Sequence, residues 1–171
     1  MFVRRLFAAC AALAGLGFAS SPALAAPEMV AFTAGYRPGT IVVNTGERRL
    51  YLVLGGGAAV RYKVGVGRAG KQWAGVSRVD GKYLYPAWAP PADLARERRM
   101  STAVIPGGSP HNPMGVAALT LAGGQYAIHG TNAPNSVGGF VSAGCIRMHN
   151  QDITDLYQRV PVGTPVVVVA R

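Results

Sequence analysis

One of the two cysteines lies in a segment whose residue types suit covalent catalysis. Cys145 directly follows a glycine in the run from Ser142 to Met148 (SAGCIRM), and His129 precedes it by 16 positions. A thiol nucleophile needs a base that takes its proton and donors that stabilise the oxyanion. Imidazole titrates near neutral pH, so His129 is the candidate base. The backbone amides around Gly144 and Cys145 are the candidate oxyanion donors, and the pattern predicts acyl transfer through a cysteine.

Arg147 lies two residues after this cysteine and supplies a cation that can hold a substrate carboxylate. Two other interpretations of the same residues stay open. In one, Cys145 is an inert buried thiol and His129 is an ordinary histidine at a strand end. In the other, Cys145, His129, His111 and His149 bind a metal. Zinc sites use compact, paired ligand spacings, and the spacing here is diffuse, so no metal is expected.

The elements that position these residues are expected to be mostly strands. β-branched and alternating runs bounded by turn residues predict strands over 40–44, 49–54, 58–66, 118–121, 126–129 and 166–169, the last of them fully buried. Residues 76–84 predict a hairpin or strand-turn pair, because Asp80-Gly81 is a typical turn dipeptide.

Helices are expected to be few and short. Apolar residues at 153, 156, 157 and 160 follow helical spacing, which predicts a helix over 151–160 with Asn150 as its N-cap. A second short helix is expected over 92–100. The proline-rich segment 86–91 predicts a rigid surface loop that presents Trp88, because each proline removes a backbone donor.

Length and composition favour one globular domain. The chain has 171 residues, half of them apolar, and carries 17 Lys and Arg against 7 Asp and Glu, with a formal net charge of +10. Charged residues make up 14%, which argues against a disordered, highly charged tail. No basic helix with interleaved aromatic residues is present, so a nucleic-acid partner is not expected. The excess of basic residues instead favours anionic polymers or carboxylate-bearing substrates as partners.

The first 25 residues have the pattern of a secretory signal peptide: a basic start at Arg4 and Arg5, an apolar run over 6–19 and a small-residue cleavage site ending at Ala25. The sequence therefore predicts a signal peptide over 1–25, a short lead over 26–38 and a domain over 39–171. Cleavage leaves Cys145 as the sole cysteine. Lipid or membrane attachment, with Cys10 or the apolar run retained, is the alternative.

The chain from Gly39 to Ala170 resembles an L,D-transpeptidase catalytic domain of the YkuD type. The resemblance rests on the segments 129–132 (HGTN) and 142–148, with further similarity at 112–115 (NPMG) and 152–157 (DITDLY). Many members of this family carry a histidine two residues before the cysteine, where this chain has Ala143. The implied fold is a mostly β sandwich or barrel with one or two short helices.

The resemblance implies a peptidoglycan L,D-transpeptidase of the periplasm that needs no cofactor. The donor would be a tetrapeptide stem that loses its terminal D-Ala, the acceptor an amine of a second stem or of an envelope-protein lysine, and carbapenem β-lactams would acylate the thiol. With water as acceptor the enzyme is a carboxypeptidase, and a non-catalytic wall-binding module is a further alternative. The implied site consists of the nucleophile Cys145, the base and acid His129, the oxyanion and support residues Gly144, Ser142 and Gly130, and the substrate contacts Arg147, Asn112 and Trp88.

Overall fold

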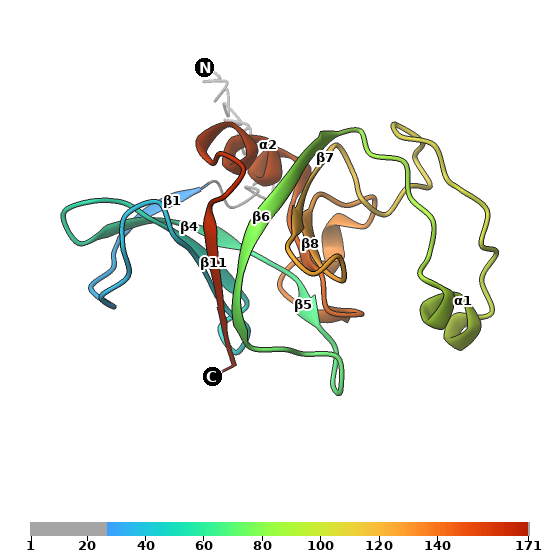
Figure 1. Cartoon of the computed structure of the whole chain (residues 1–171), viewed down its shortest axis with the longest axis horizontal. Coiled ribbons are helices and arrows are strands. Elements are labelled where there is room, and N and C mark those ends of the chain that lie inside the picture. Colours follow the sequence, from blue (N-terminus) through green and yellow to red (C-terminus); the bar gives the residue numbers. More distant parts are fainter. Residues whose placement is uncertain (1–26, 171) are drawn as a thin grey trace, which may run out of the picture.

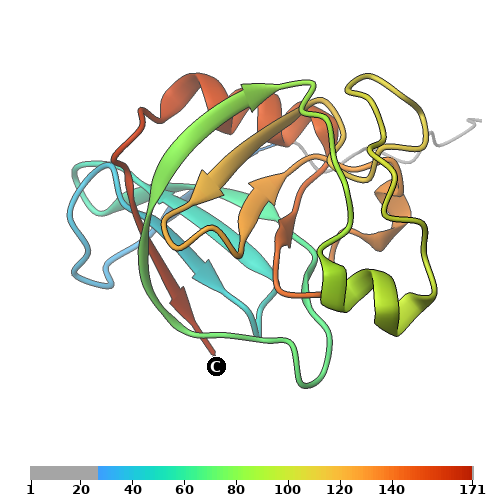
Figure 2. The same cartoon turned by 45° about the vertical axis from the view of Figure 1, so that its right-hand side comes forward.

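The computed structural model describes residues 27–170, which form eleven strands, two α-helices and one short 3-10 helix (Figures 1 and 2). The predicted signal peptide over 1–25 lies outside the described residues. The strands are β1 (Glu28–Ala31), β2 (Ile41–Asn44), β3 (Arg49–Val53), β4 (Ala58–Lys63), β5 (Val66–Gly67), β6 (Gly75–Leu84), β7 (Ala117–Leu121), β8 (Ala127–His129), β9 (Phe140–Ser142), β10 (Ile146–Arg147) and β11 (Pro165–Val169). The helices are α1 (Ala92–Arg98), α2 (Asn150–Arg159) and the 3-10 helix η1 (Pro134–Ser136).

Nine strands form one sheet in the order β1-β4-β3-β2-β11-β6-β7-β8-β10, and β5 pairs with β9 in a second, two-stranded sheet. The β2–β11 and β8–β10 pairs are parallel, and the other pairs of the large sheet are antiparallel. The predicted mostly β class with short helices is confirmed. Within residues 27–170 the sheet does not close into a barrel, because β1 and β10 remain its two edges.

The segment expected to form a hairpin is one continuous strand, β6, so that prediction is wrong. β6 pairs with β11 through its first half and with β7 through its second half, and it links the two parts of the sheet (Figure 1). Asp80-Gly81 forms an irregularity in the register between β6 and β7 instead of a turn. Asp80 accepts a hydrogen bond from Thr120, and a side chain at position 81 would collide with Thr120 and Tyr83. The glycine therefore serves close packing within a bulged strand.

Helix α2 covers β7 and β8 and buries the apolar stripe that its sequence predicts. Ile153 and Leu156 are fully buried in the core, together with residues of both parts of the sheet. The Lys82 ammonium of β6 donates to the carbonyls of Tyr157 and Val160, each at 2.7 Å, which satisfies two backbone acceptors at the C-terminal end of α2. The helix is thus held at both its apolar face and its end.

Three smaller differences from the sequence predictions concern the lead, the N-cap of α2 and the burial of β11. The lead over 26–38 contributes the edge strand β1, which pairs antiparallel with β4. His149 is the N-cap of α2, and Asn150 is instead its first residue, whose side-chain oxygen accepts from the Thr131 amide at 2.9 Å. In β11, residues 166 and 168 are buried while 167 and 169 are half-buried, so the strand alternates instead of being fully buried. No helix among the described residues has the length and apolar character needed to span a membrane.

Candidate active site

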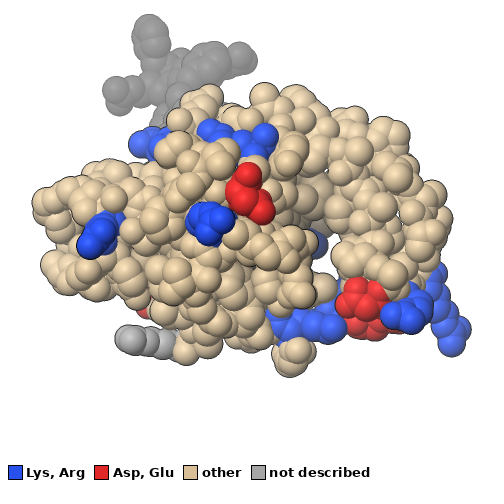
Figure 3. All heavy atoms as spheres, in the orientation of Figure 1, with Lys and Arg blue, Asp and Glu red and all other residues tan. Residues whose placement is uncertain are grey.

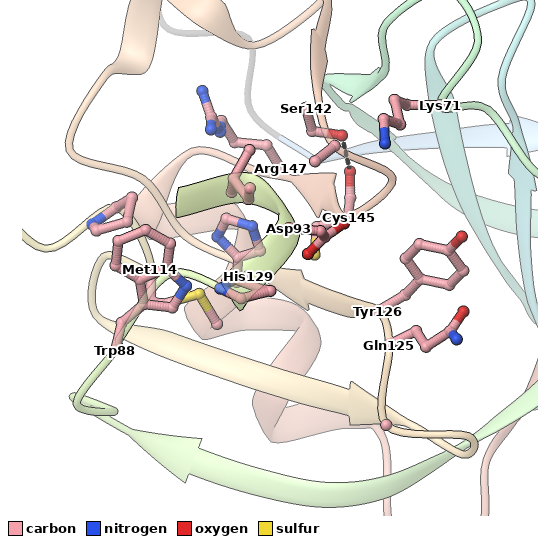
Figure 4. A pocket seen from close by; sticks show the side chains of 15 residues that line it. Lys71, Trp88, Asp93, Met114, Gln125, Tyr126, His129, Ser142, Cys145 and Arg147 are labelled. Atoms are coloured by element: carbon pink, nitrogen blue, oxygen red, sulfur yellow. Dashed lines mark hydrogen bonds between the residues drawn. The ribbon is translucent and has the colours of Figure 1, made fainter. Parts of the chain in front are cut away.

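Parallel pairing of β8 with β10 brings His129 and Cys145 together. β8 ends at His129, β10 begins directly after Cys145, and the register places Arg147 opposite His129. Residues 130–145 form the crossover that a parallel pair requires. His129 and Cys145 line one cavity of about 510 Å³, with Trp88 and Tyr126 on opposite sides in the view of Figure 4.

His129 is buried, and its ring orientation is fixed by the backbone. Its Nδ1 lies 2.6 Å from the carbonyl oxygen of Gly130, and only 4% of the residue is exposed. A carbonyl oxygen only accepts, so Nδ1 carries the proton in the neutral ring and Nε2 is left as the acceptor. Gly130, which was predicted to support the site, thus contacts the His129 ring through its carbonyl group.

The pKa values of the two groups favour an uncharged pair at neutral pH. Burial, followed by the positive charge of Arg147, lowers the pKa of His129 to about 4. Burial raises the pKa of the Cys145 thiol, and a hydrogen bond from the Ala127 backbone and the Arg147 charge oppose this rise. The free site thus holds a neutral imidazole beside a neutral thiol, in contrast to a preformed thiolate–imidazolium pair.

The Ser142 hydroxyl organises the turn that carries the cysteine. It donates to the Cys145 carbonyl at 2.6 Å and accepts from the Gly144 amide at 3.0 Å, and Figure 4 shows the first of these bonds. The Gly144 N–H is thereby occupied, which corrects the expectation that it is an oxyanion donor. Among the described residues the Ala143 and Cys145 N–H groups donate to no protein acceptor, so these two amides of the turn remain available to a ligand.

Two aromatic residues that the sequence analysis missed hold this turn in place. Trp73, from the loop between β5 and β6, donates its Nε1–H to the Gly144 carbonyl at 2.9 Å. Its ring stacks on Tyr126 with centroids 4.7 Å apart and an interplanar angle of 6°. Gly144 has φ = +127°, and a side chain there would collide with the Tyr126 ring. The available signal was a tryptophan between Gln72 and Ala74 in an expected loop, since a large aromatic residue in a loop usually has a packing partner.

The hydrogen-bonding groups of the Arg147 side chain are only partly satisfied. One terminal nitrogen, Nη1, donates to the Ser136 hydroxyl at 3.0 Å, whereas Nε is buried without a hydrogen-bond partner. The residue lines the main cavity and also a smaller neighbouring cavity. Arg147 therefore both contacts the crossover loop and faces the cleft.

Of the two other residues expected to contact substrate, Trp88 and Asn112, only Trp88 lines the main cavity. The proline-rich loop presents it there, as predicted. Asn112 does not line this cavity, because it is buried and its side-chain amide is hydrogen-bonded to the backbone. Its Nδ2 donates to the carbonyls of Pro86, Ile105 and Pro106, and its Oδ1 accepts from the Met114 amide. Asn112 thus ties the Trp88 loop to the following loop and has no group free for substrate.

The four residues considered as metal ligands, Cys145, His129, His111 and His149, do not line one common cavity. His111 lines the smaller neighbouring cavity, and His149 lines a separate cavity beside the start of α2. Among residues 27–170 no cluster of three or more histidine, cysteine or acidic side chains is placed to hold a metal ion.

An open, mostly β sheet that brings these histidine and cysteine segments to one cavity defines the architecture of an L,D-transpeptidase catalytic domain. The family model for that domain, YkuD, matches residues 38–168. The chain belongs to this family.

Three comparisons illustrate the relationship. The protein "Probable L,D-transpeptidase ErfK/SrfK" of Salmonella typhimurium is 40% identical over 161 residues, which cover 89% of this chain and 50% of that protein, so this chain spans about half its length. An Enterococcus faecium L,D-transpeptidase structure (C442S mutant) shares the fold with a TM-score of 0.62 at 18% identity, covering 78% of this chain and 50% of that one. A Brucella melitensis structure named "Probable carnitine operon oxidoreductase caia" is 38% identical with a TM-score of 0.57, covering 85% of this chain and 94% of that one.

Proposed function

We propose that this protein is a peptidoglycan L,D-transpeptidase in which Cys145 is the nucleophile and His129 the general base. The observation that supports this most strongly is the fixed tautomer of His129. Its Nδ1–H is bonded to the Gly130 carbonyl, so Nε2 is the atom left to take a proton, and the ring shares one cavity with the thiol. A thiol, an imidazole and a free backbone amide supply the roles that acyl transfer needs.

In the acylation step, Nε2 of His129 takes the Cys145 proton while Sγ attacks the carbonyl of the third stem residue. The C–S bond forms and the negative charge moves to the carbonyl oxygen, within reach of the Cys145 N–H. The C–N bond to the terminal D-Ala then breaks, and His129 returns the proton to the leaving amine. Because both groups begin uncharged, proton transfer accompanies attack.

In the second step an amine attacks the thioester. The new C–N bond forms, the C–S bond breaks, and the proton released by the amine passes through His129 to Sγ. The acceptor is an amine of a second stem or of an envelope-protein lysine, and water in its place gives a carboxypeptidase. The leader over 1–25 directs the protein to the periplasm, where peptidoglycan lies.

The test is incubation of the purified mature protein with tetrapeptide muropeptides, with products identified by mass. The proposal expects loss of one D-Ala per donor and a cross-linked dimer. A donor that loses D-Ala and gains only water would identify a carboxypeptidase. A donor that binds and stays intact would support the wall-binding module and overturn the enzymatic proposal.

A further inference from the structure

Trp73 contacts the turn formed by residues 142–145, the nucleophile turn, without facing the cleft. It lies in the loop between β5 and β6 and packs against the core together with Tyr126, on whose ring its own ring stacks. The main cavity, as the described residues form it, is lined by Tyr126 and Cys145 and not by Trp73. The mechanism proposed above gives Trp73 no role, although its indole N–H is bonded next to the nucleophile.

Three successive peptide groups around Cys145 each have an anchor. The Ser142 hydroxyl accepts from the Gly144 N–H and donates to the Cys145 carbonyl, so it holds the peptide before and the peptide after the one that joins Gly144 to Cys145. Trp73 holds the joining peptide, because its Nε1–H donates to the Gly144 carbonyl at 2.9 Å. Within residues 27–170 no other group donates to that carbonyl, and the Cys145 N–H donates to no protein acceptor. The orientation of the joining peptide therefore depends on Trp73.

Gly144 makes this anchor necessary. It has φ = +127° and no Cβ, so no side chain of its own restricts rotation of the peptide that follows it. That peptide is planar and trans, which directs the Gly144 carbonyl and the Cys145 N–H in opposite directions. Because the carbonyl is fixed toward the Trp73 indole, the Cys145 N–H points away from Trp73.

The loop that carries Trp73 is itself held by two neighbours. The Arg68 backbone N–H donates to the Ser142 carbonyl at 3.0 Å, which ties the loop to the nucleophile turn. The Arg68 guanidinium pairs with Glu97 of α1, and the Lys71 ammonium lies 3.9 Å from the same carboxylate. Figure 3 shows side chains of both charges gathered at the edge of the molecule where α1 and this loop meet. The position of the indole is thus set before substrate binds.

We propose that Trp73 is a positioning residue for acyl transfer, which holds the Gly144 carbonyl so that the Cys145 N–H is aimed at the oxyanion and strengthened as a donor. This rests on the proposed function. A hydrogen bond accepted by a carbonyl polarises its peptide group, so the N–H of the same group becomes a stronger donor. A donor fixed in advance where charge develops stabilises the transition state more than the bound substrate. Trp73 therefore acts on the rate of acylation through the backbone and leaves substrate affinity unchanged.

The test removes the Nε1–H and keeps an aromatic ring. Trp73→Phe retains a ring to stack on Tyr126, and benzothienylalanine introduced at position 73, in which sulfur replaces the N–H, retains the whole shape of the indole and serves if Trp73→Phe does not fold. Gln72→Ala is the matched control, because Gln72 is the exposed neighbour of Trp73 in the same loop. D-Ala release from tetrapeptide muropeptides gives kcat and KM. Alkylation of Cys145 by iodoacetamide, followed against pH, reports the thiol alone, because this displacement creates no oxyanion.

Both replacements of Trp73 should lower kcat for D-Ala release about 10-fold, a part of the roughly 100-fold or larger loss that follows complete removal of an oxyanion donor. KM, the alkylation rate and its pH dependence should not change, and Gln72→Ala should behave as the parent. An unchanged kcat, a higher KM at constant kcat, or a parallel fall in D-Ala release and alkylation would overturn the role given to Trp73. Absence of D-Ala release from the parent protein would instead overturn the proposed function, and the role of Trp73 with it.

Discussion

At the residue scale, two opposing influences determine the pKa of His129. Carbonyl groups of Gly130 and Pro113 favour the protonated ring, whereas burial and the Arg147 charge disfavour it, and the second pair prevails. A base with a pKa far below the working pH is a weak proton acceptor, but it is fully in its accepting form at neutral pH. The raised pKa of the thiol means that little thiolate exists before substrate arrives. In the proposed mechanism, substrate binding must therefore bring attack and proton transfer together.

The charge state of His129 can be measured directly by NMR of the 15N-labelled imidazole. We expect the ring to titrate with a pKa of about 4 and to remain the neutral Nδ1–H tautomer from pH 6 to 8. Cys145→Ala, which removes the thiol and keeps the ring environment, should show the same behaviour. A ring that stays protonated at pH 7 in the parent protein and loses its proton in Cys145→Ala would reveal a preformed ion pair, contrary to the neutral pair described above.

At the element scale, α2 contains a buried charge that should make stability depend on pH. Asp152 lies in the first turn, is 1% exposed, and neither carboxylate oxygen has a hydrogen-bond partner. A negative charge at a helix N-terminus is favoured by the helix dipole, but burial without partners outweighs this here. Burial, followed by the charge of Asp155, raises the pKa of Asp152 to about 6.

The direction in which stability changes with pH follows from proton binding by Asp152. Between about pH 4 and pH 6 the folded state holds the Asp152 proton and the unfolded state has lost it, so the free energy of unfolding falls as pH rises. Asp152→Asn should remove this pH dependence. Between pH 4.5 and pH 8 the free energy of unfolding of the variant should therefore rise by about 1–2 kcal/mol relative to that of the parent. Asp93→Asn, an exposed acid in the first turn of α1, is the control. Chemical unfolding at both pH values measures the difference, and parallel curves for parent and Asp152→Asn would contradict the buried-charge account.

At the scale of the whole molecule, local patterns predicted most of the elements. Strand segments such as 41–44 and the stripe of α2 carry their periodicity in neighbouring residues, so the sequence identifies them. The cysteine and histidine segments were also recognisable as motifs, and the structure places both in one cavity. The location of the candidate site was therefore predictable from residue types within short runs.

Features that depend on distant contacts were not predictable. Asp80-Gly81 has the composition of a turn, and it is part of a strand only because it packs against Thr120 of the neighbouring strand β7. The family resemblance implied a substrate contact for the Asn112 side chain, yet its amide nitrogen donates to three backbone carbonyls. Trp73 donates to the carbonyl of Gly144, which lies 71 positions further along the chain. Such long-range pairings follow from the sheet order, which no local pattern encodes.

The central claim, that Cys145 is the nucleophile, is tested most directly by intact-mass analysis of the mature protein after exposure to a carbapenem, with peptide mapping of the adduct. The account predicts one adduct per chain, located on Cys145, and none on a folded Cys145→Ala protein, since a thiol is the acylated group. Circular dichroism of Cys145→Ala verifies that the fold is kept. An adduct mapped to any other residue, or the same adduct on Cys145→Ala, would contradict the account.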